Sequence, residues 1–227
     1  MRAFAMAFLV VTAGSPVFAD SIVASINSPY ALGGTVTAID LTSVAVGPSP
    51  VINTAAYSVA FTPGTDPDTG VVQGSLAGKY AAPIMGNGSP WPGKYFSTGT
   101  AGNSITISFT TAQTGLAFLW GSVDTYNGVT VSFNDGAVTY TGSQVAAAAA
   151  ILPNGGQGPG GSAYVAINST PGFTFNNVTF ASTNYALEFA DVKASTTEFQ
   201  VPDGGVTLTL LGAALVGIET LRRRLSA

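Results

Sequence analysis

Alternating apolar and hydroxyl-bearing residues recur through the middle of the chain and predict β-strands. In residues 104–110, isoleucine and phenylalanine fall on one face of an extended chain, while serine and threonine fall on the other. Residues 57–61 and 129–133 repeat this period of two. Residues 116–120 are instead continuously apolar, which predicts a central strand covered on both faces. No amphipathic helical pattern separates these runs, so we expect an all-β, antiparallel fold.

Two turn signals suggest how these strands are connected. The dipeptides Asn127-Gly128 and Asp135-Gly136 both favour the positive φ angles of tight hairpin turns. They bracket the strand at 129–133 and therefore predict an antiparallel meander over residues 116–141.

Other local features complete the predicted fold. The apolar phase changes at Asn176-Asn177, which indicates a β-bulge, and a last strand is expected from residue 187. Residues 146–150 are all alanine and predict one short helix with Ser143 as its N-cap. The glycine-rich segment 153–161 lacks the Gly-Lys-Ser/Thr of a phosphate-binding loop and is expected to be a mobile loop. Strands of this length and spacing predict a two-sheet antiparallel β-sandwich, jelly-roll-like, with one short helix.

Both ends of the chain are typical of targeting segments. Residues 1–19 contain an arginine, an apolar stretch and the small residues that signal peptidase requires, so cleavage is expected at Ala19-Asp20. The apolar run 206–218 predicts a C-terminal transmembrane helix. By the positive-inside rule, a basic cluster directly after it places the C-terminus in the cytoplasm. That cluster is Arg222, Arg223 and Arg224. The chain is therefore divided into a signal peptide (1–19), an extracytoplasmic β-sandwich domain (20–200) and a C-terminal sorting signal (201–227).

A short motif stands directly before the apolar run and consists of Val201, Pro202, Asp203, Gly204 and Gly205. Motif, apolar helix and arginine cluster, in this order, resemble the PEP-CTERM sorting signals that exosortases of Gram-negative bacteria recognise. Val-Pro-Asp-Gly-Gly resembles a variant of the commoner Val-Pro-Glu-Pro form. The resemblance implies that an exosortase cleaves the chain near Pro202-Asp203, and that the inner membrane holds only the precursor.

A second resemblance lies in the body of the chain. Residues 118–127, Phe-Leu-Trp-Gly-Ser-Val-Asp-Thr-Tyr-Asn, are similar to the Trp-Gly-Ser-x-Asp-x-Tyr-Asn stretch of exosortase-dependent surface proteins. Residues 187–192, Leu-Glu-Phe-Ala-Asp-Val, resemble the closing strand of the same proteins. The resemblance covers residues 57–192 and implies a destination at the cell surface.

Composition excludes several classes of function. Between residues 20 and 200, three lysines face nine acidic residues, a balance of −6, and there is no arginine. Nucleic acid is therefore not expected as a partner, because its phosphates require clustered lysine and arginine. The whole chain has no cysteine and no histidine. These absences exclude Ser-His-Asp triads, cysteine nucleophiles, histidine bases, and metal sites built from thiolates or imidazoles.

Two groups of acidic residues are candidates for calcium. Asp66 and Asp68 form the Asp-x-Asp start of a calcium loop, but no glutamate closes the loop, so we interpret the segment as a turn. Asp124, Glu188 and Asp191 are the second candidate, a structural Ca²⁺ site at a sheet edge. Ordinary polar strand ends are the alternative for these three residues.

Aromatic residues suggest a surface for sugars, because aromatic faces pack well against pyranose rings. The candidates are Trp91, Tyr95, Trp120 and Tyr126. Trp120 lies in the apolar strand and is expected in the core, whereas Trp91 stands between two prolines in a predicted exposed loop. Trp91, Tyr126 and Asp124 are therefore the candidate ligand-binding residues.

The sequence thus predicts an exported, non-enzymatic protein of the cell surface or extracellular matrix. Its expected partners are an exosortase, the inner membrane and a surface polysaccharide, and its one candidate cofactor is a structural Ca²⁺. A carbohydrate- or matrix-binding module is the first alternative. The second is a glycan-active hydrolase that uses Asp124 and Glu188 as paired carboxyls.

Overall fold

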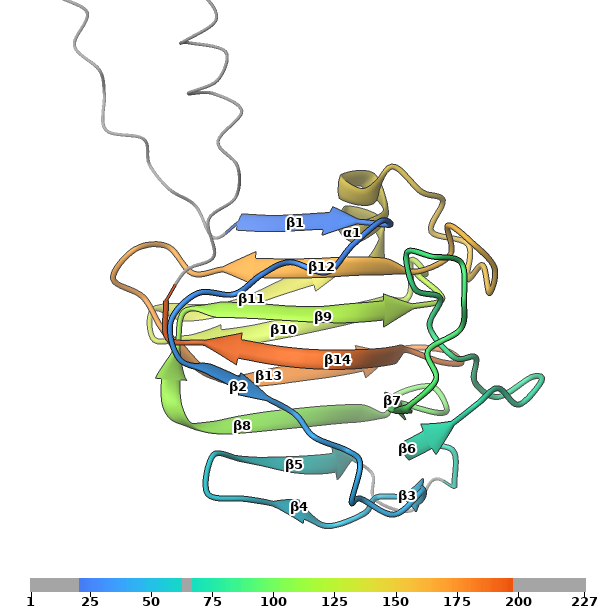
Figure 1. Ribbon diagram of the computed structural model, residues 1–227, viewed down its shortest axis with the longest axis horizontal. Helices are drawn as coiled ribbons and strands as arrows, with labels where there is room; N and C mark the ends of the chain where they lie inside the picture. Colours follow the sequence, from blue (N-terminus) through green and yellow to red (C-terminus); the bar gives the residue numbers. More distant parts are fainter. Residues whose placement is uncertain (1–20, 63–66, 198–227) are drawn as a thin grey trace, which may run out of the picture.

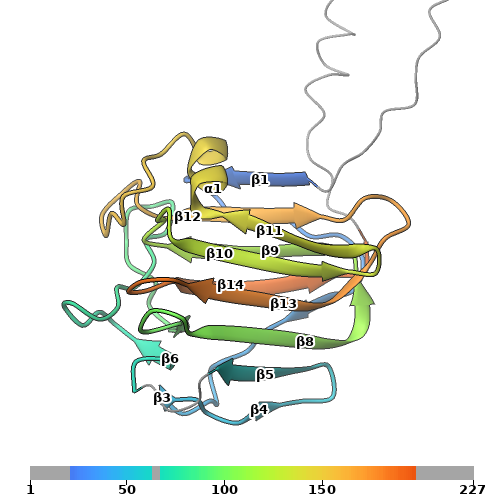
Figure 2. The ribbon, with the colours of Figure 1, turned by 180° about the vertical axis from the view of Figure 1, so that it is seen from behind.

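A computed structural model describes residues 21–62 and 67–197 (Figures 1 and 2). These residues form the predicted all-β fold, with two antiparallel sheets and one short helix. The predicted signal peptide (1–19) and sorting signal (201–227) lie outside the described residues. Within the described part of the chain, no helix has the length and apolar character needed to cross a membrane.

The two sheets differ in size. Sheet A has the strand order β1-β12-β9-β14-β7-β6-β3, and β2 pairs with β14 beside this path. Its strands are β1 (Ser21–Ser25), β2 (Val36–Ala38), β3 (Gly47–Pro48), β6 (Gly70–Gln73), β7 (Lys94–Ser97), β9 (Gly115–Gly121), β12 (Ala163–Asn168) and β14 (Glu188–Ser195). Sheet B has the order β11-β10-β13-β8-β5-β4. Its strands are β4 (Ile52–Asn53), β5 (Tyr57–Thr62), β8 (Ser104–Gln113), β10 (Asn127–Phe133), β11 (Gly136–Thr141) and β13 (Phe175–Ser182).

The chain changes sheet at nearly every connection between β7 and β14. It passes from β7 in sheet A to β8 in sheet B, to β9 in sheet A, and then to the β10–β11 hairpin in sheet B. It returns through helix α1 (Gly142–Ala149) to β12 in sheet A, and ends with β13 in sheet B and β14 in sheet A. The last strand therefore lies between β9 and β7, where Glu188 pairs with Gly121 on one side and Ser97 on the other.

Aromatic rings from both sheets meet between the layers. Phe180 of β13 stacks on Phe189 of β14, with ring centroids 3.7 Å apart. The Phe180 ring also meets Phe118 of β9 edge-on at 5.1 Å. All three side chains are buried. Because burying one phenylalanine contributes about 1.5–3 kcal/mol, these rings are a major part of what joins the two sheets.

Strand β9 is buried on both faces, as its continuous apolar run predicted. Trp120 faces the core between the sheets and is fully buried, as expected. Leu119 belongs instead to a second apolar cluster on the outer face of sheet A, together with Tyr95. Tyr80 and Trp91, from the long connection between β6 and β7, pack against this cluster. The same connection helps to shape the pocket described below.

The predicted meander over residues 116–141 is wrong in its first half. Asn127-Gly128 lies inside β10, where both residues pair with β13, and forms no hairpin turn. Because β9 and β10 belong to different sheets, residues 122–126 cross from one sheet to the other. The second half is confirmed, since β10 and β11 form a hairpin through Asn134-Asp135.

Two strands carry bulges. Ser132 of β10 pairs with Asn177 and the next residue pairs with Phe175, so Asn176 is the extra residue of the bulge that the sequence predicted. Strand β14 has a second irregularity, where its register against β9 shifts between Ala190 and Lys193. Asp191 lies within this shift and has φ +51°, a conformation that few non-glycine residues adopt.

The predicted helix is present, but it begins earlier than expected. Its N-cap is Thr141 instead of Ser143. The Thr141 hydroxyl accepts a hydrogen bond from the Gln144 N–H at 3.3 Å, and the Gln144 side chain accepts one from the Thr141 N–H at 2.8 Å. This reciprocal pair is a capping box, which satisfies two donors at the start of the helix.

We expect Thr141→Ala to lower the free energy of unfolding by about 1 kcal/mol, because the variant loses the capping hydroxyl. Ser143→Ala, at an exposed position, should change it by less than about 0.5 kcal/mol. Denaturant titration of both variants measures the difference, and equal losses would contradict the assignment of the cap.

Candidate functional site

A pocket of about 210 Å³ lies where β9 ends and β14 begins. Phe189 points into the core between the sheets, so its neighbour Glu188 points to the outer face of sheet A. Four segments contribute to the lining: the β6–β7 connection, the crossing from β9 to β10, the loop after α1 and the entry to β14. Residues far apart in the chain therefore meet in one place.

Glu188 is a deeply buried carboxyl group at this pocket, with 2% of the residue exposed. Its Oε1 accepts a hydrogen bond from the Ala81 N–H at 3.0 Å. Its Oε2 is buried and has no hydrogen-bond partner within the described residues. Burial raises the pKa of Glu188 to about 8, and the charge of Asp124 acts in the same direction. The Ala81 amide and the nearby Ser122 hydroxyl lower this pKa, but by less, and neither has hydrogen-bond geometry to Oε2.

Asp124 provides the second carboxyl group of the pocket and is also buried. Burial raises its pKa, while the nearby Tyr126 hydroxyl acts in the opposite direction. Two glycines permit the chain to pack around it. A Cβ on Gly142 would lie 1.8 Å from the Asp124 carbonyl oxygen, and a Cβ on Gly155 would lie 2.9 Å from its Oδ1. Gly155 therefore leaves open a space beside the carboxylate that any other residue would fill.

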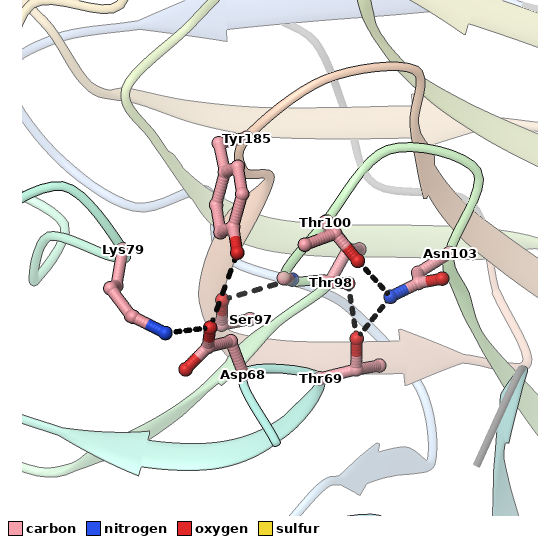
Figure 3. Close-up of polar contacts among 9 residues, drawn as sticks. Asp68, Thr69, Lys79, Ser97, Thr98, Thr100, Asn103 and Tyr185 are labelled. Atoms are coloured by element: carbon pink, nitrogen blue, oxygen red, sulfur yellow. Dashed lines mark hydrogen bonds and ion pairs between the residues drawn. The ribbon is translucent and has the colours of Figure 1, made fainter. Parts of the chain in front are cut away.

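Asp68 fixes two residues at the rim of the pocket (Figure 3). The Lys79 Nζ lies 2.5 Å from Asp68 Oδ2, and the Tyr185 hydroxyl donates to the same oxygen at 3.3 Å. The Tyr126 hydroxyl donates in turn to the Tyr185 carbonyl oxygen at 2.6 Å. Lys79, Tyr126 and Tyr185 are thus held in place by acceptors of the protein itself.

Next to Asp68, hydrogen bonds of threonine hydroxyls connect this rim to the residue before β14 (Figure 3). The Thr69 hydroxyl donates to the Thr98 carbonyl oxygen at 2.5 Å and accepts from Asn103 Nδ2 at 2.7 Å. The Thr98 hydroxyl accepts from the Leu187 N–H at 2.9 Å. Asp68 lies in a turn, as the sequence suggested, and its carboxylate binds a lysine and a tyrosine. Asp66 lies outside the described residues.

The three carboxyls of the predicted calcium site are not brought together. Asp124 and Glu188 share the pocket, but Asp191 lines a different pocket of about 170 Å³ and pairs with Lys193 at 2.8 Å. If side chains alternated regularly along β14 after Phe189, the Asp191 side chain would face the core between the sheets. The irregularity in β14 turns it away from that core. Within the described residues, no three acidic side chains are grouped as metal ligands.

The aromatic candidates do not form one platform either. Trp91 is half-buried against the outer cluster and donates its indole N–H to the Lys94 carbonyl oxygen at 3.2 Å. It lines the same pocket as Asp191. Tyr95 and Trp120 are fully buried, so only Tyr126 of the four lies at the pocket with Asp124.

Sequence reasoning missed part of the lining. Gly155 and Gln157 come from the glycine-rich segment predicted as a mobile loop, yet that segment is hydrogen-bonded to the crossing after β9. The Val123 N–H donates to the Gly161 carbonyl oxygen at 2.9 Å, and the Val123 carbonyl oxygen accepts from the Gly155 N–H at 3.0 Å. Ser122 has φ +47°, and strain of this kind is frequent at functional sites. The glycines of this segment are the sequence signal of its close packing, because a Cβ on Gly155 or Gly161 would collide with neighbouring atoms.

The two segments that carry the resemblance in the body meet at this pocket. Residues 118–127 supply Ser122, Asp124 and Tyr126, and residues 187–192 supply Glu188. No known protein family matches the sequence, and no characterised protein matches it.

Proposed function

We propose that this protein is an exported, non-catalytic protein of the cell surface or extracellular matrix, and that its β-sandwich is the part delivered there. The order of segments at the chain end carries the proposal: motif 201–205, apolar run 206–218 and arginines 222–224. Export removes residues 1–19, the C-terminal helix holds the precursor in the inner membrane, and an exosortase cleaves near Pro202-Asp203.

The strand order supports a jelly-roll sandwich as the delivered domain. The inner orders β12-β9-β14-β7 and β11-β10-β13-β8 have the form of two four-stranded sheets connected by Greek keys. The buried apolar residues between the sheets form its core, and because the chain has no cysteine this packing stabilises the domain without disulfides.

The positions of the chain ends also support an orientation in which the pocket faces away from the membrane. Four residues pair in one row across sheet A, from Ser21 at the start of β1 to Ser195 at the end of β14. The two residues between them are Asn168 and Gly115. Both ends of the described chain therefore lie at one end of the sheet (Figure 1). Glu188 lies at the opposite end, so an anchor after β14 would leave the pocket facing away from the membrane.

Deletion of residues 201–227 is expected to move the protein from the inner membrane to the periplasm or medium, because the deletion removes the only predicted anchor. Cell fractionation with immunoblotting measures the change. Asp124→Asn, in the domain, should leave the location unchanged and is the control. A truncated protein that fails to fold would show that the tail belongs to the core, and the anchor would then be the wrong interpretation.

A binding module is the second candidate, and the pocket between Asp124 and Glu188 favours it. Surface domains bind glycans through small numbers of well-placed polar groups beside aromatic side chains. Two buried carboxyls with three lining tyrosines, Tyr80, Tyr126 and Tyr185, fit this description.

A further inference from the structure

We propose that the pocket between Asp124 and Glu188 binds a primary ammonium group carried on a sugar ring, as in an amino-sugar unit of a surface polysaccharide. The inference rests on the proposed function and names the ligand class for its binding-module candidate.

One carboxyl oxygen at the pocket has no partner. Glu188 Oε2 is buried and has no hydrogen-bond partner within the described residues, although the side chain lines the pocket. A buried polar atom without a partner is costly, so a ligand that supplies an N–H to the ionised carboxylate recovers that free energy. The Tyr126 hydroxyl donates to the Tyr185 carbonyl oxygen at 2.6 Å and lies beside Asp124, so it leaves Glu188 Oε2 without a partner.

The two acidic side chains of the pocket favour a cationic ligand. Two buried carboxyls beside each other disfavour ionisation of both, and a cation between them reverses this. The titratable groups that face Glu188 or share its pocket are Asp124, Tyr95, Tyr126, Lys79, Tyr80 and Tyr185. Lys79 is the single cation among these described residues, and its ammonium group is paired with Asp68. A cation that neutralises the two carboxyls would therefore come from the ligand.

The lining of the pocket fits an organic cation better than a metal ion. Ca²⁺ prefers 6–8 oxygen ligands, whereas this pocket offers two carboxyls, and no group of three acidic residues occurs in the described chain. Tyr80, Tyr126 and Tyr185 also line the pocket, and aromatic rings attract ammonium groups and pack against sugar rings. At about 210 Å³ the pocket is smaller than the roughly 300–1,000 Å³ of sites for drug-sized ligands, which favours a small ligand such as a single sugar ring.

Binding of an ammonium group should release a proton. Burial keeps Glu188 protonated at pH 7, because its pKa is raised to about 8. An ammonium group stabilises the ionised carboxylate, so the carboxyl proton passes to the buffer when the ligand binds. A neutral sugar gives no such release.

The test compares glucosamine, glucose and N-acetylglucosamine by titration calorimetry at pH 7. The full-length chain is used, in a detergent without a sugar headgroup and in two buffers of different ionisation enthalpy. Glucosamine should bind at least about tenfold more tightly than the two neutral sugars and release about one proton. Glu188→Gln should abolish the proton release, and Asp124→Asn should weaken glucosamine binding about tenfold. Asp191→Asn, at the other pocket, should bind as the parent does, and thermal melting verifies that each variant is folded.

Equal binding of the three sugars, no binding of glucosamine, or its displacement by Ca²⁺ alone would each overturn the inference. Release of reducing sugar from a glucosamine polymer, lost in Glu188→Gln, would also overturn it in favour of a hydrolase. Location by cell fractionation is independent of these outcomes. A protein that reaches the surface but binds no glucosamine refutes only the ligand, whereas a protein that stays in the cytoplasm refutes the proposed function.

Discussion

Glu188→Gln is expected to stabilise the protein at alkaline pH and to remove most of the pH dependence of unfolding that this carboxyl causes. The folded-state pKa is raised from 4.5 to about 8. Between these values the folded state holds a proton that the unfolded state has lost. The parent's free energy of unfolding therefore falls as pH rises, by up to about 1.4 kcal/mol per pH unit. Below pH 4.5 both states hold the proton and the carboxyl adds no slope.

Glutamine cannot ionise, so at pH 9 the variant should be more stable than the parent by roughly 2–5 kcal/mol. Urea denaturation at a series of pH values from 4 to 9 measures both profiles. Asp135→Asn removes a carboxyl from the exposed β10–β11 turn and serves as the matched control. Parallel profiles for parent and Glu188→Gln would mean that Glu188 ionises normally in the folded protein.

Phe189→Ala should cost about 3–5 kcal/mol in the free energy of unfolding. The side chain is fully buried and stacks on Phe180 of sheet B at 3.7 Å and on Phe96 of sheet A at 4.9 Å. Its removal leaves a cavity in the middle of the contact between the sheets. Since domains of this size are stable by only about 5–15 kcal/mol, the loss is a large share of the total.

Denaturant titration measures this loss against Leu152→Ala, whose side chain is 72% exposed and should change stability by less than about 0.5 kcal/mol. A loss below about 1 kcal/mol for Phe189→Ala would be inconsistent with close packing between the sheets at this ring stack.

Local periodicity predicted the strands well, because alternation depends only on which side of one strand is buried. The strands at Ser104–Gln113 and Asn127–Phe133 follow their apolar and hydroxyl-bearing residues. The same information does not say which sheet the next strand joins. For this reason the sequence predicts a hairpin turn at Asn127-Gly128, although these residues begin β10 and the chain crosses from sheet A to sheet B just before them.

The candidate site was predicted in part. Asp124 and Glu188 were recognised as candidates, but their meeting depends on the pairing of β14 with β9, which places Glu188 opposite Gly121. Long-range pairing of this kind leaves no local signal. Asp191 was expected to meet them at a sheet edge, yet the irregularity in β14 separates it from the pocket. Tyr185 was not recognised because its role depends on contacts with Asp68 in a distant turn.

The intact mass of the protein recovered from the surface of an exosortase-containing Gram-negative cell tests the proposed delivery most directly. We predict a mature chain that begins at Asp20 and ends within residues 201–205, because both targeting segments are removed. A surface protein that retains residues 206–227, or a cytoplasmic protein that retains residues 1–19, would contradict the proposal.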